Sequence, residues 1–146
     1  MNKSALRFDV PSWLSEMPNV PLAEVLPAVR SEGLVWVMSD VWVVTREGAP
    51  EGLQNILSAA EKDDVIVEWT IIEQLALWEH QCNDITLRGY KCLDDAETAI
   101  EIVAFDSGPW EFTVNDPSRL NTDLLRNLGG RWVIIDENGD TLALVD

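Results

Sequence analysis

Residues 131–145 read RWVIIDENGDTLALV, and this stretch decides the fold class. Two runs rich in aliphatic residues, 131–135 and 141–145, flank a polar segment that contains Asn138-Gly139. Such runs are typical of strands, and Asn-Gly between two of them is a strong signal for a tight turn. The sequence therefore predicts an antiparallel β-hairpin over these fifteen residues.

Two further hairpins are predicted upstream from the same kind of pattern. Apolar and β-branched residues fill 34–45 except at Ser39-Asp40, which we interpret as a turn. Strand-like residues at 98–105 and 110–114 flank a segment rich in turn-forming residues. Both regions are therefore expected to add antiparallel strands to the sheet.

The stretch 65–80 has strand composition in its first half and helical propensity in its second half. We assign strand to both halves, because a turn at Asn83-Asp84 would then place Glu79 opposite Arg88. Opposite charges that face each other across two strands stabilise a hairpin. A helix over the second half is the alternative.

Three short helices are predicted to open at Pro21, Pro50 and Pro117, each followed by apolar residues at helical spacing. Proline inside a helix removes a hydrogen bond and crowds the preceding turn, so Pro27 is expected to kink or split the first helix. Strands that alternate with a few short helices are typical of an α+β fold with an antiparallel sheet.

A chain of 146 residues has the usual size of one domain. We therefore expect a single α+β domain over residues 1–146, with a mostly antiparallel sheet of meander and hairpins. Within it, residues 1–33 are expected to form a proline-rich helical segment. Residues 34–146 are expected to form the sheet with two helices.

Charge is the unusual feature of the composition. Ten Lys and Arg residues stand against 26 Asp and Glu residues, for a net charge of −16. Such a chain repels phosphate backbones and anionic membranes at long range, so direct binding of nucleic acid or a membrane surface is disfavoured. No apolar run approaches the roughly 20 residues that span a bilayer, and no signal peptide is recognisable, so a cytoplasmic location is expected.

The negative charge is concentrated in the middle of the chain. Residues 61–111 contain 13 acidic and three basic residues, a net charge of −10, whereas 1–60 and 112–146 each carry −3. One interpretation is a solvated surface that keeps the protein soluble. The other is a face shaped for a cationic partner, where charge complementarity speeds association and sets specificity.

The sequence contains no recognisable catalytic or phosphate-binding motif. His80 is the sole histidine, and we expect it to be a packed or sheet-margin residue with no catalytic dyad to Cys82. The string Asp136-Glu137-Asn138-Gly139-Asp140 resembles the start of a calcium loop, but its glycine is at the fourth position and the required Glu at the twelfth is missing. We therefore predict a turn there, and no enzyme activity, metal site or cofactor.

The candidate partner-binding residues combine acidic side chains of the middle region with two tryptophans. Most of the seven tryptophans lie in predicted strands and are expected in the core, whereas one lies within the proline-rich N-terminal segment and one follows a turn. Exposed tryptophan is enriched in binding hot spots. The candidates are Glu73, Glu79, Asp84, Asp94, Asp95, Glu97, Trp13 and Trp110.

These features predict a small acidic inhibitor, such as a bacterial cytoplasmic immunity or antitoxin protein. Its expected partner is a basic toxin domain, for example a nuclease, whose active cleft it blocks with carboxylates in place of phosphates. One alternative is a nucleic-acid mimic of the anti-restriction or anti-CRISPR type, which requires acids in regular rows. Another is a secretion chaperone or adaptor, which requires an apolar groove. Either a monomer or a homodimer is compatible with the sequence.

Overall fold

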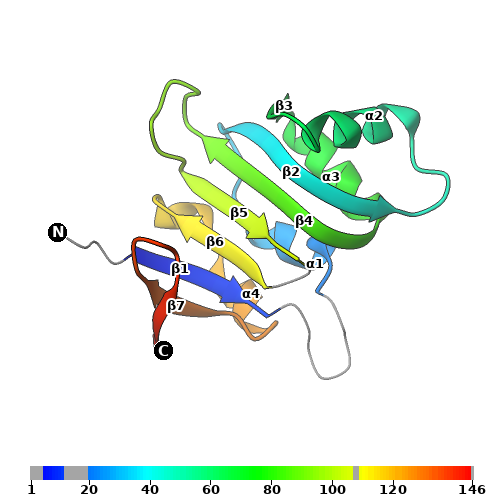
Figure 1. Cartoon of the computed structure of the whole chain (residues 1–146). Coiled ribbons are helices and arrows are strands. Elements are labelled where there is room, and N and C mark those ends of the chain that lie inside the picture. Colours follow the sequence, from blue (N-terminus) through cyan, green and yellow to red (C-terminus); the bar gives the residue numbers. More distant parts are fainter. Residues whose placement is uncertain (1–4, 12–19, 107–108, 146) are drawn as a thin grey trace.

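A computed structural model describes residues 5–11, 20–106 and 109–145, and in this part of the chain eight strands form one antiparallel sheet (Figure 1). The order of strands across the sheet is β3-β2-β4-β5-β6-β1-β7-β8. The strands are β1 (Ala5–Val10), β2 (Val35–Thr45), β3 (Val65–Val67), β4 (Glu79–Tyr90), β5 (Ile100–Ala104), β6 (Trp110–Val114), β7 (Arg131–Ile135) and β8 (Thr141–Val145).

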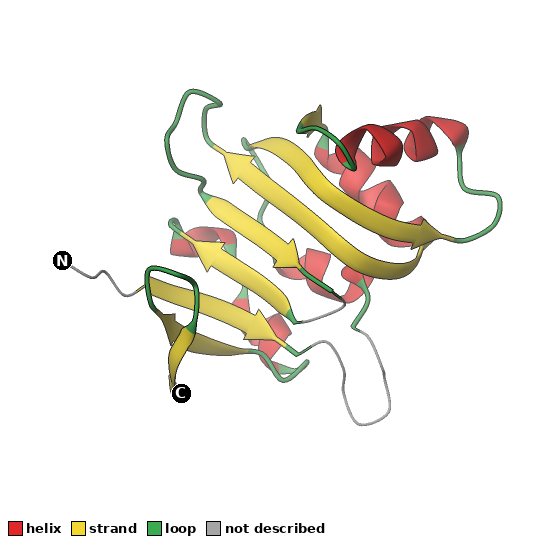
Figure 2. Ribbon diagram, in the orientation of Figure 1, coloured by secondary structure: helices red, strands yellow, loops and turns green. Residues whose placement is uncertain are grey.

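The helices cover one face of this sheet and leave the other face open (Figure 2). They are α1 (Leu22–Val25), the 3₁₀ helix η1 (Leu26–Ala28), α2 (Glu51–Ala60), α3 (Trp69–Trp78), the 3₁₀ helix η2 (Pro117–Arg119) and α4 (Thr122–Arg126). The fold is thus α+β, as the sequence predicts. We refer to the uncovered side as the open face.

The core lies between the helices and the covered face. A row of side chains crosses five neighbouring strands at directly paired positions, and every one of them is fully buried. The row consists of Met38, Leu87, Ile102, Phe112 and Phe8. Because side chains alternate along a strand, the residues between these positions point to the open face.

Several local predictions are confirmed. β7 and β8 form the predicted C-terminal hairpin, β5 pairs with β6, and α2 begins directly after Pro50. The first helix is split at the predicted place, since α1 ends at Val25 and η1 contains Pro27. The third helix is divided into η2 and α4, because Asp116 caps the first piece and Asn121 caps the second.

Residues 1–33 are expected to form a helical segment, and this prediction is wrong at Ala5–Val10, which form the strand β1. This strand lies between β6 and β7, near the centre of the sheet order. Its sequence alternates apolar Leu6, Phe8 and Val10 with polar Arg7 and Asp9, which is the period of a strand with one buried face. The nearby prolines obscure this pattern, and both partner strands come from the last third of the chain.

The predicted turn at Ser39-Asp40 is wrong. β2 continues through this dipeptide as one strand of 11 residues. Asp40 instead adopts a left-handed backbone conformation, with φ at 51°, where the pairing of β2 with β4 changes register. The two polar residues therefore mark a β-bulge, which bends and twists a strand without ending it.

The assignment of strand to the whole of 65–80 is also wrong. β3 at its start and Glu79-His80, the first residues of β4, are strand, whereas α3 occupies the residues between them, with Ile72 and Leu75 buried against the core. The helical propensity of this segment and the burial of two residues three positions apart both favour a helix. The predicted turn at Asn83-Asp84 is absent because β4 runs straight through it and pairs with β2, so Glu79 does not face Arg88.

Candidate protein-binding site

The acidic loop between β4 and β5, residues 91–98, stands at the end of the longest strand. Its residues are exposed except for the half-buried Thr98 at its end. The backbone N–H of Asp95 donates to the carbonyl of Cys92 at 2.9 Å, and the carboxylate of Asp95 accepts from the N–H of Cys92 at 3.2 Å. These reciprocal bonds shape the turn. At its base the N–H of Ala99 donates to the carbonyl of Gly89 at 2.8 Å, which closes the loop.

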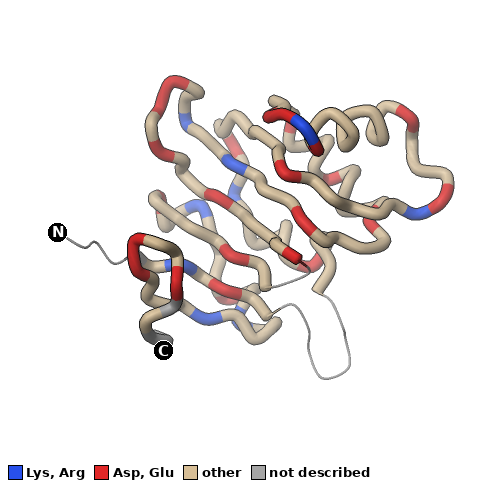
Figure 3. Tube along the Cα trace, viewed as in Figure 1, with Lys and Arg blue, Asp and Glu red and all other residues tan. Residues whose placement is uncertain are grey.

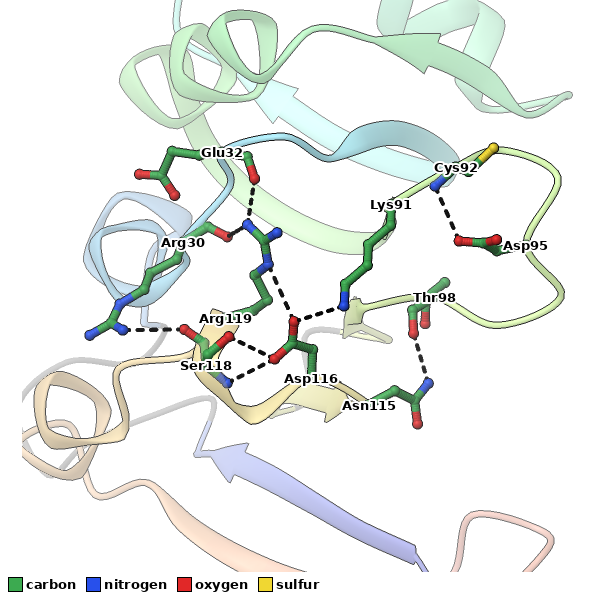
Figure 4. Close-up of polar contacts among 10 residues, drawn as sticks. All are labelled: Arg30, Glu32, Lys91, Cys92, Asp95, Thr98, Asn115, Asp116, Ser118 and Arg119. Atoms are coloured by element: carbon green, nitrogen blue, oxygen red, sulfur yellow. Dashed lines mark hydrogen bonds and ion pairs between the residues drawn. The ribbon is translucent and has the colours of Figure 1, made fainter.

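Asp116 holds the base of the loop against the end of β6 (Figure 4). Its carboxylate accepts from the hydroxyl of Ser118 at 2.6 Å and lies 3.2 Å from the amine of Lys91. Arg119 is at 3.7 Å. The hydrogen bond from Ser118, followed by that from Lys91, lowers the pKa of Asp116 to about 2. Asp116 is thus ionised at neutral pH, and its carboxylate forms an ion pair with Lys91, the only basic residue of the loop.

A cavity of about 370 Å³ lies between the acidic loop and the end of β6. The charged residues that line it are Asp95, Glu97 and Asp116 together with Lys91, and Asn115 is also part of the lining. The amide nitrogen of Asn115 donates to the carbonyl of Thr98 at 2.8 Å, so it braces the loop from the other side. The cavity therefore has a negatively charged wall that the surrounding hydrogen bonds hold in place.

The structure brings three of the predicted partner-binding residues together. Asp94, Asp95 and Glu97 share the acidic loop, and all three are exposed. Asp84 lies six residues before the end of β4, which at about 3.3 Å per residue is roughly 20 Å away along the strand. Glu73 is exposed on α3, next to a different cavity formed with α1 and η1.

Two of the predicted residues are not surface groups, and a third lies outside the described residues. Trp110 is only 3% exposed, and its indole N–H donates to the carbonyl of Val20 at 2.8 Å, so its expected exposure is wrong. Position 110 opens β6 on the covered face, where a large ring fills the core. Glu79 is 7% exposed. Trp13 is the residue that the structure does not describe.

Glu79 has a structural role at the junction of α3 and β4. Its carboxylate accepts a hydrogen bond of 2.8 Å from the backbone N–H of Leu22, the first residue of α1. Burial raises the pKa of Glu79, while the Leu22 hydrogen bond and the charge of Arg46 partly oppose this shift. The prediction that Glu79 lies on a polar strand face is therefore wrong, because the side chain satisfies a helix end inside the fold.

Replacement of Glu79 by glutamine is expected to raise the melting temperature more at pH 7.5 than at pH 4. The folded-state pKa is raised, so folding favours the protonated form, and stability falls as the pH rises from the unfolded pKa through the folded pKa. Glutamine keeps the acceptor for Leu22 and removes this titration. Thermal unfolding of both proteins at the two pH values measures the difference. An equal change at both would show that titration of Glu79 is not the cause.

Among the described residues, His80 and Cys82 make no hydrogen bond with each other. His80 is exposed near the start of β4, so of the two expected settings the structure shows the sheet margin, whereas Cys82 is half-buried. Burial, followed by the charges of Glu79 and Asp84, raises the pKa of the Cys82 thiol well above its usual range. A thiol in this environment stays protonated and is a poor nucleophile.

The segment that resembles a calcium loop is the turn of the β7–β8 hairpin. The carboxylate of Asp136 accepts from the backbone N–H groups of Asn138 and Asp140 at 2.8 and 3.0 Å. Gly139 has a φ of 85°, which favours glycine. The turn interpretation is thus confirmed. Across the residues that the structure describes, no group of three or more His, Cys, Asp or Glu side chains is arranged to hold a metal ion.

Sequence reasoning found the acidic loop but missed the residues that hold it. Asp116 and Asn115 directly follow β6, and nothing in the local sequence marks either residue as a partner of the loop. Their link to the loop depends on the pairing of β5 with β6, which brings Asn115 next to Thr98. No local sequence signal encodes that contact.

Comparisons with known proteins give no relative of this chain: no family model, no curated protein and no solved structure matches it. Within the described ranges, no helix is both long and apolar enough to cross a lipid bilayer.

Proposed function

We propose that the protein is a non-enzymatic, cytoplasmic inhibitor of the immunity or antitoxin type, which binds a basic protein through its acidic loop. The expected partner is a toxin domain whose active cleft binds phosphates, such as a nuclease. The loop would enter that cleft and place carboxylates where the substrate's phosphates lie. The net charge of −16 supports fast association with such a partner.

The observation that carries this proposal is the pair of unmatched charges on the acidic loop. Asp94 and Glu97 are exposed, and neither makes an ion pair with any residue that the structure describes. The loop's one cationic residue, Lys91, binds Asp116. Figure 3 shows the acidic positions of the loop in red where the chain turns from β4 into β5. Like charges held close together repel one another, and a cationic partner would relieve that repulsion.

Three acidic residues of the open face, unlike Asp94 and Glu97, have arginine partners. Glu101 pairs with Arg88 at 3.0 Å, and Arg7 bridges Asp9 at 2.7 Å and Glu111 at 3.2 Å. Each of these carboxylates thus has a cationic neighbour within the protein, although Asp9 and Glu111 share Arg7. The contrast with the loop supports a localised contact surface and gives little support to a nucleic-acid mimic, which would need long rows of unmatched acids.

Charge reversal in the loop is expected to weaken partner binding strongly. The test variant is Asp94→Lys with Glu97→Lys, because these side chains leave the hydrogen bonds of Asp95 intact. Wild type and variant are used to capture partners from a lysate of the source organism, followed by mass spectrometry and binding measurements with the purified partner. We expect a basic protein, with a loss of about 2–5 kcal/mol for each buried charge pair that is broken. Association should be slower in high salt.

The matched control is Glu51→Lys with Glu61→Lys, which changes the net charge by the same amount. Both residues are exposed and lie at the two ends of α2, on the other side of the view in Figure 1 from the acidic loop. Lysine is unfavourable at the start of a helix and favourable at its end, so the effects on stability should largely offset. Equal losses for both variants, an acidic partner or a salt-independent association rate would contradict the proposal.

A further inference from the structure

Trp42 is an exposed tryptophan on the open face of the sheet. It is 58% exposed, whereas the other five tryptophans that the structure describes are buried or half-buried. It lies directly opposite Asp84 of β4. A large aromatic side chain in this position is costly in water unless something covers it, and Trp is enriched among binding hot spots.

The β-bulge in β2 is what places Trp42 on this face. Ser39 pairs with Thr86 and Trp42 pairs with Asp84, so two residues of β2 face one residue of β4 between these pairs. Without the extra residue, Val41 would share the open face with Ser39, and Trp42 would point into the core. Instead Val41 is 3% exposed in the core, and Trp42 points outward.

The bulge depends on an unfavourable backbone conformation at Asp40. Its φ of 51° lies in the left-handed region, which residues other than glycine adopt at a cost. Such conformations persist where the surrounding structure imposes them, and they are found preferentially at functional sites. Bulges also re-aim side chains next to binding sites. The geometry thus exposes an aromatic ring that a regular strand would bury.

A second exposed aromatic residue and two acidic residues, Asp84 and Asp106, lie near this position. Phe105, which is 74% exposed, follows Ala104, the residue that pairs with Ile85 of β4. The next residue, Asp106, donates its backbone N–H to the carboxylate of Asp84 at 2.6 Å and also has a positive φ, 53°. Trp42 thus lies across from Asp84 at the usual spacing of about 5 Å between strands, and Phe105 directly follows β5 on the other side of β4.

The acidic groups near these rings have no cationic counterpart. Asp84 and Asp106 make no ion pair within the part of the chain that the structure describes. Two exposed rings framed by carboxylates fit a guanidinium group, which stacks on aromatic faces and forms paired hydrogen bonds with a carboxylate. A lysine amine lacks the planar shape that both contacts use.

We propose that Trp42, Phe105, Asp84 and Asp106 form a second contact surface, the Trp42 patch, which binds an arginine side chain of the basic partner. This inference rests on the proposed function. It adds an anchor residue on the open face and a preference for arginine over lysine. The acidic loop would supply attraction at long range, and the Trp42 patch would supply contact energy and specificity.

Two short peptides of equal charge test the preference directly. Blocked tetra-arginine and tetra-lysine are titrated into ¹⁵N-labelled protein while the indole signal of Trp42 is followed by NMR. We expect the arginine peptide to bind about two- to fivefold more tightly, the size of an exposed cation–π contact. Trp42→Leu should abolish this difference. Equal affinity for the two peptides, or a difference that survives Trp42→Leu, would overturn the proposal.

Control variants distinguish the contribution of the Trp42 patch to peptide binding from that of the acidic loop and from that of nonspecific apolar contact. Asp94→Lys with Glu97→Lys should weaken both peptides equally, because it changes only charge. Leu77→Ala removes another exposed apolar side chain, 70% exposed on α3, and should change neither affinity. Circular dichroism of each variant reports whether the fold is kept.

The partner itself gives an independent readout. Trp42→Ala should weaken binding of the captured partner by about 30-fold or more, as hot-spot substitutions do. If a basic partner binds Trp42→Ala as tightly as wild type, the Trp42 patch is wrong while the proposed function stands. If no basic protein is captured, the proposed function fails, and the peptide titration still decides whether the patch prefers arginine.

Discussion

Replacement of Phe8 by alanine is expected to lower the free energy of unfolding by about 3–5 kcal/mol, the usual cost of deleting a buried phenylalanine ring. Phe8 is fully buried in β1 and sits in the row that crosses the sheet. It also contacts Trp132 edge-on, with the ring centres 5.2 Å apart. Alanine would leave a cavity and would remove the contacts of the Phe8 ring with its strand neighbours Phe112 and Trp132. Urea unfolding followed by fluorescence measures the change.

The conservative variant Phe8→Leu keeps most of the apolar volume and should cost clearly less. A loss below about 1 kcal/mol for Phe8→Ala would show that β1 is not part of the stable core. That result would contradict the placement of β1 between β6 and β7. The prediction therefore tests the position of β1, the strand that is not expected from the sequence.

Replacement of Gly130 by alanine is expected to cost about 3 kcal/mol, at the upper end for overpacking a core. A Cβ atom at this position would lie 2.4 Å from the Phe8 ring and 2.7 Å from the carbonyl oxygen of Leu125. Neither neighbour moves easily, because the ring is buried in the core and the oxygen belongs to the backbone. Urea unfolding again gives the magnitude.

Gly52→Ala is the matched control, because it makes the same glycine-to-alanine change at a position where the new Cβ atom has free space. Gly52 lies in α2, and a Cβ atom there would meet nothing within 4 Å. Alanine is a better helix former than glycine, so this variant should gain about 0.5–1 kcal/mol. The same chemical change thus has opposite expected signs at two glycines. A gain at Gly130 would contradict the close approach of Phe8.

The double variant Phe8→Ala with Gly130→Ala links the two predictions. The smaller side chain at position 8 leaves room for the new Cβ atom, so the combined loss should be smaller than the sum of the single losses. Residues in contact commonly show such coupling, in the range of 0.5–3 kcal/mol. Full additivity would mean that the contact with Leu125 alone causes the loss at Gly130.

The sequence by itself determined those elements whose signals are local. The hairpin of β7 and β8 follows from Asn138-Gly139 between two aliphatic runs, and α2 follows from Pro50 and an apolar stripe. The antiparallel α+β class follows from several such elements in succession. The exposure of Asp94, Asp95 and Glu97 was also predictable, because a cluster of charges is rarely buried.

Only the tertiary structure decided which residues of the long strands face water. Ser39-Asp40 resembles a turn, yet it is a bulge because β2 continues to pair with β4 beyond it. Trp42 lies within an apolar run and Trp110 follows a turn, yet the first is exposed and the second is buried. In a strand, a register shift of one residue exchanges the two faces. Register depends on hydrogen bonds to strands that are distant in the sequence, so local composition cannot specify it.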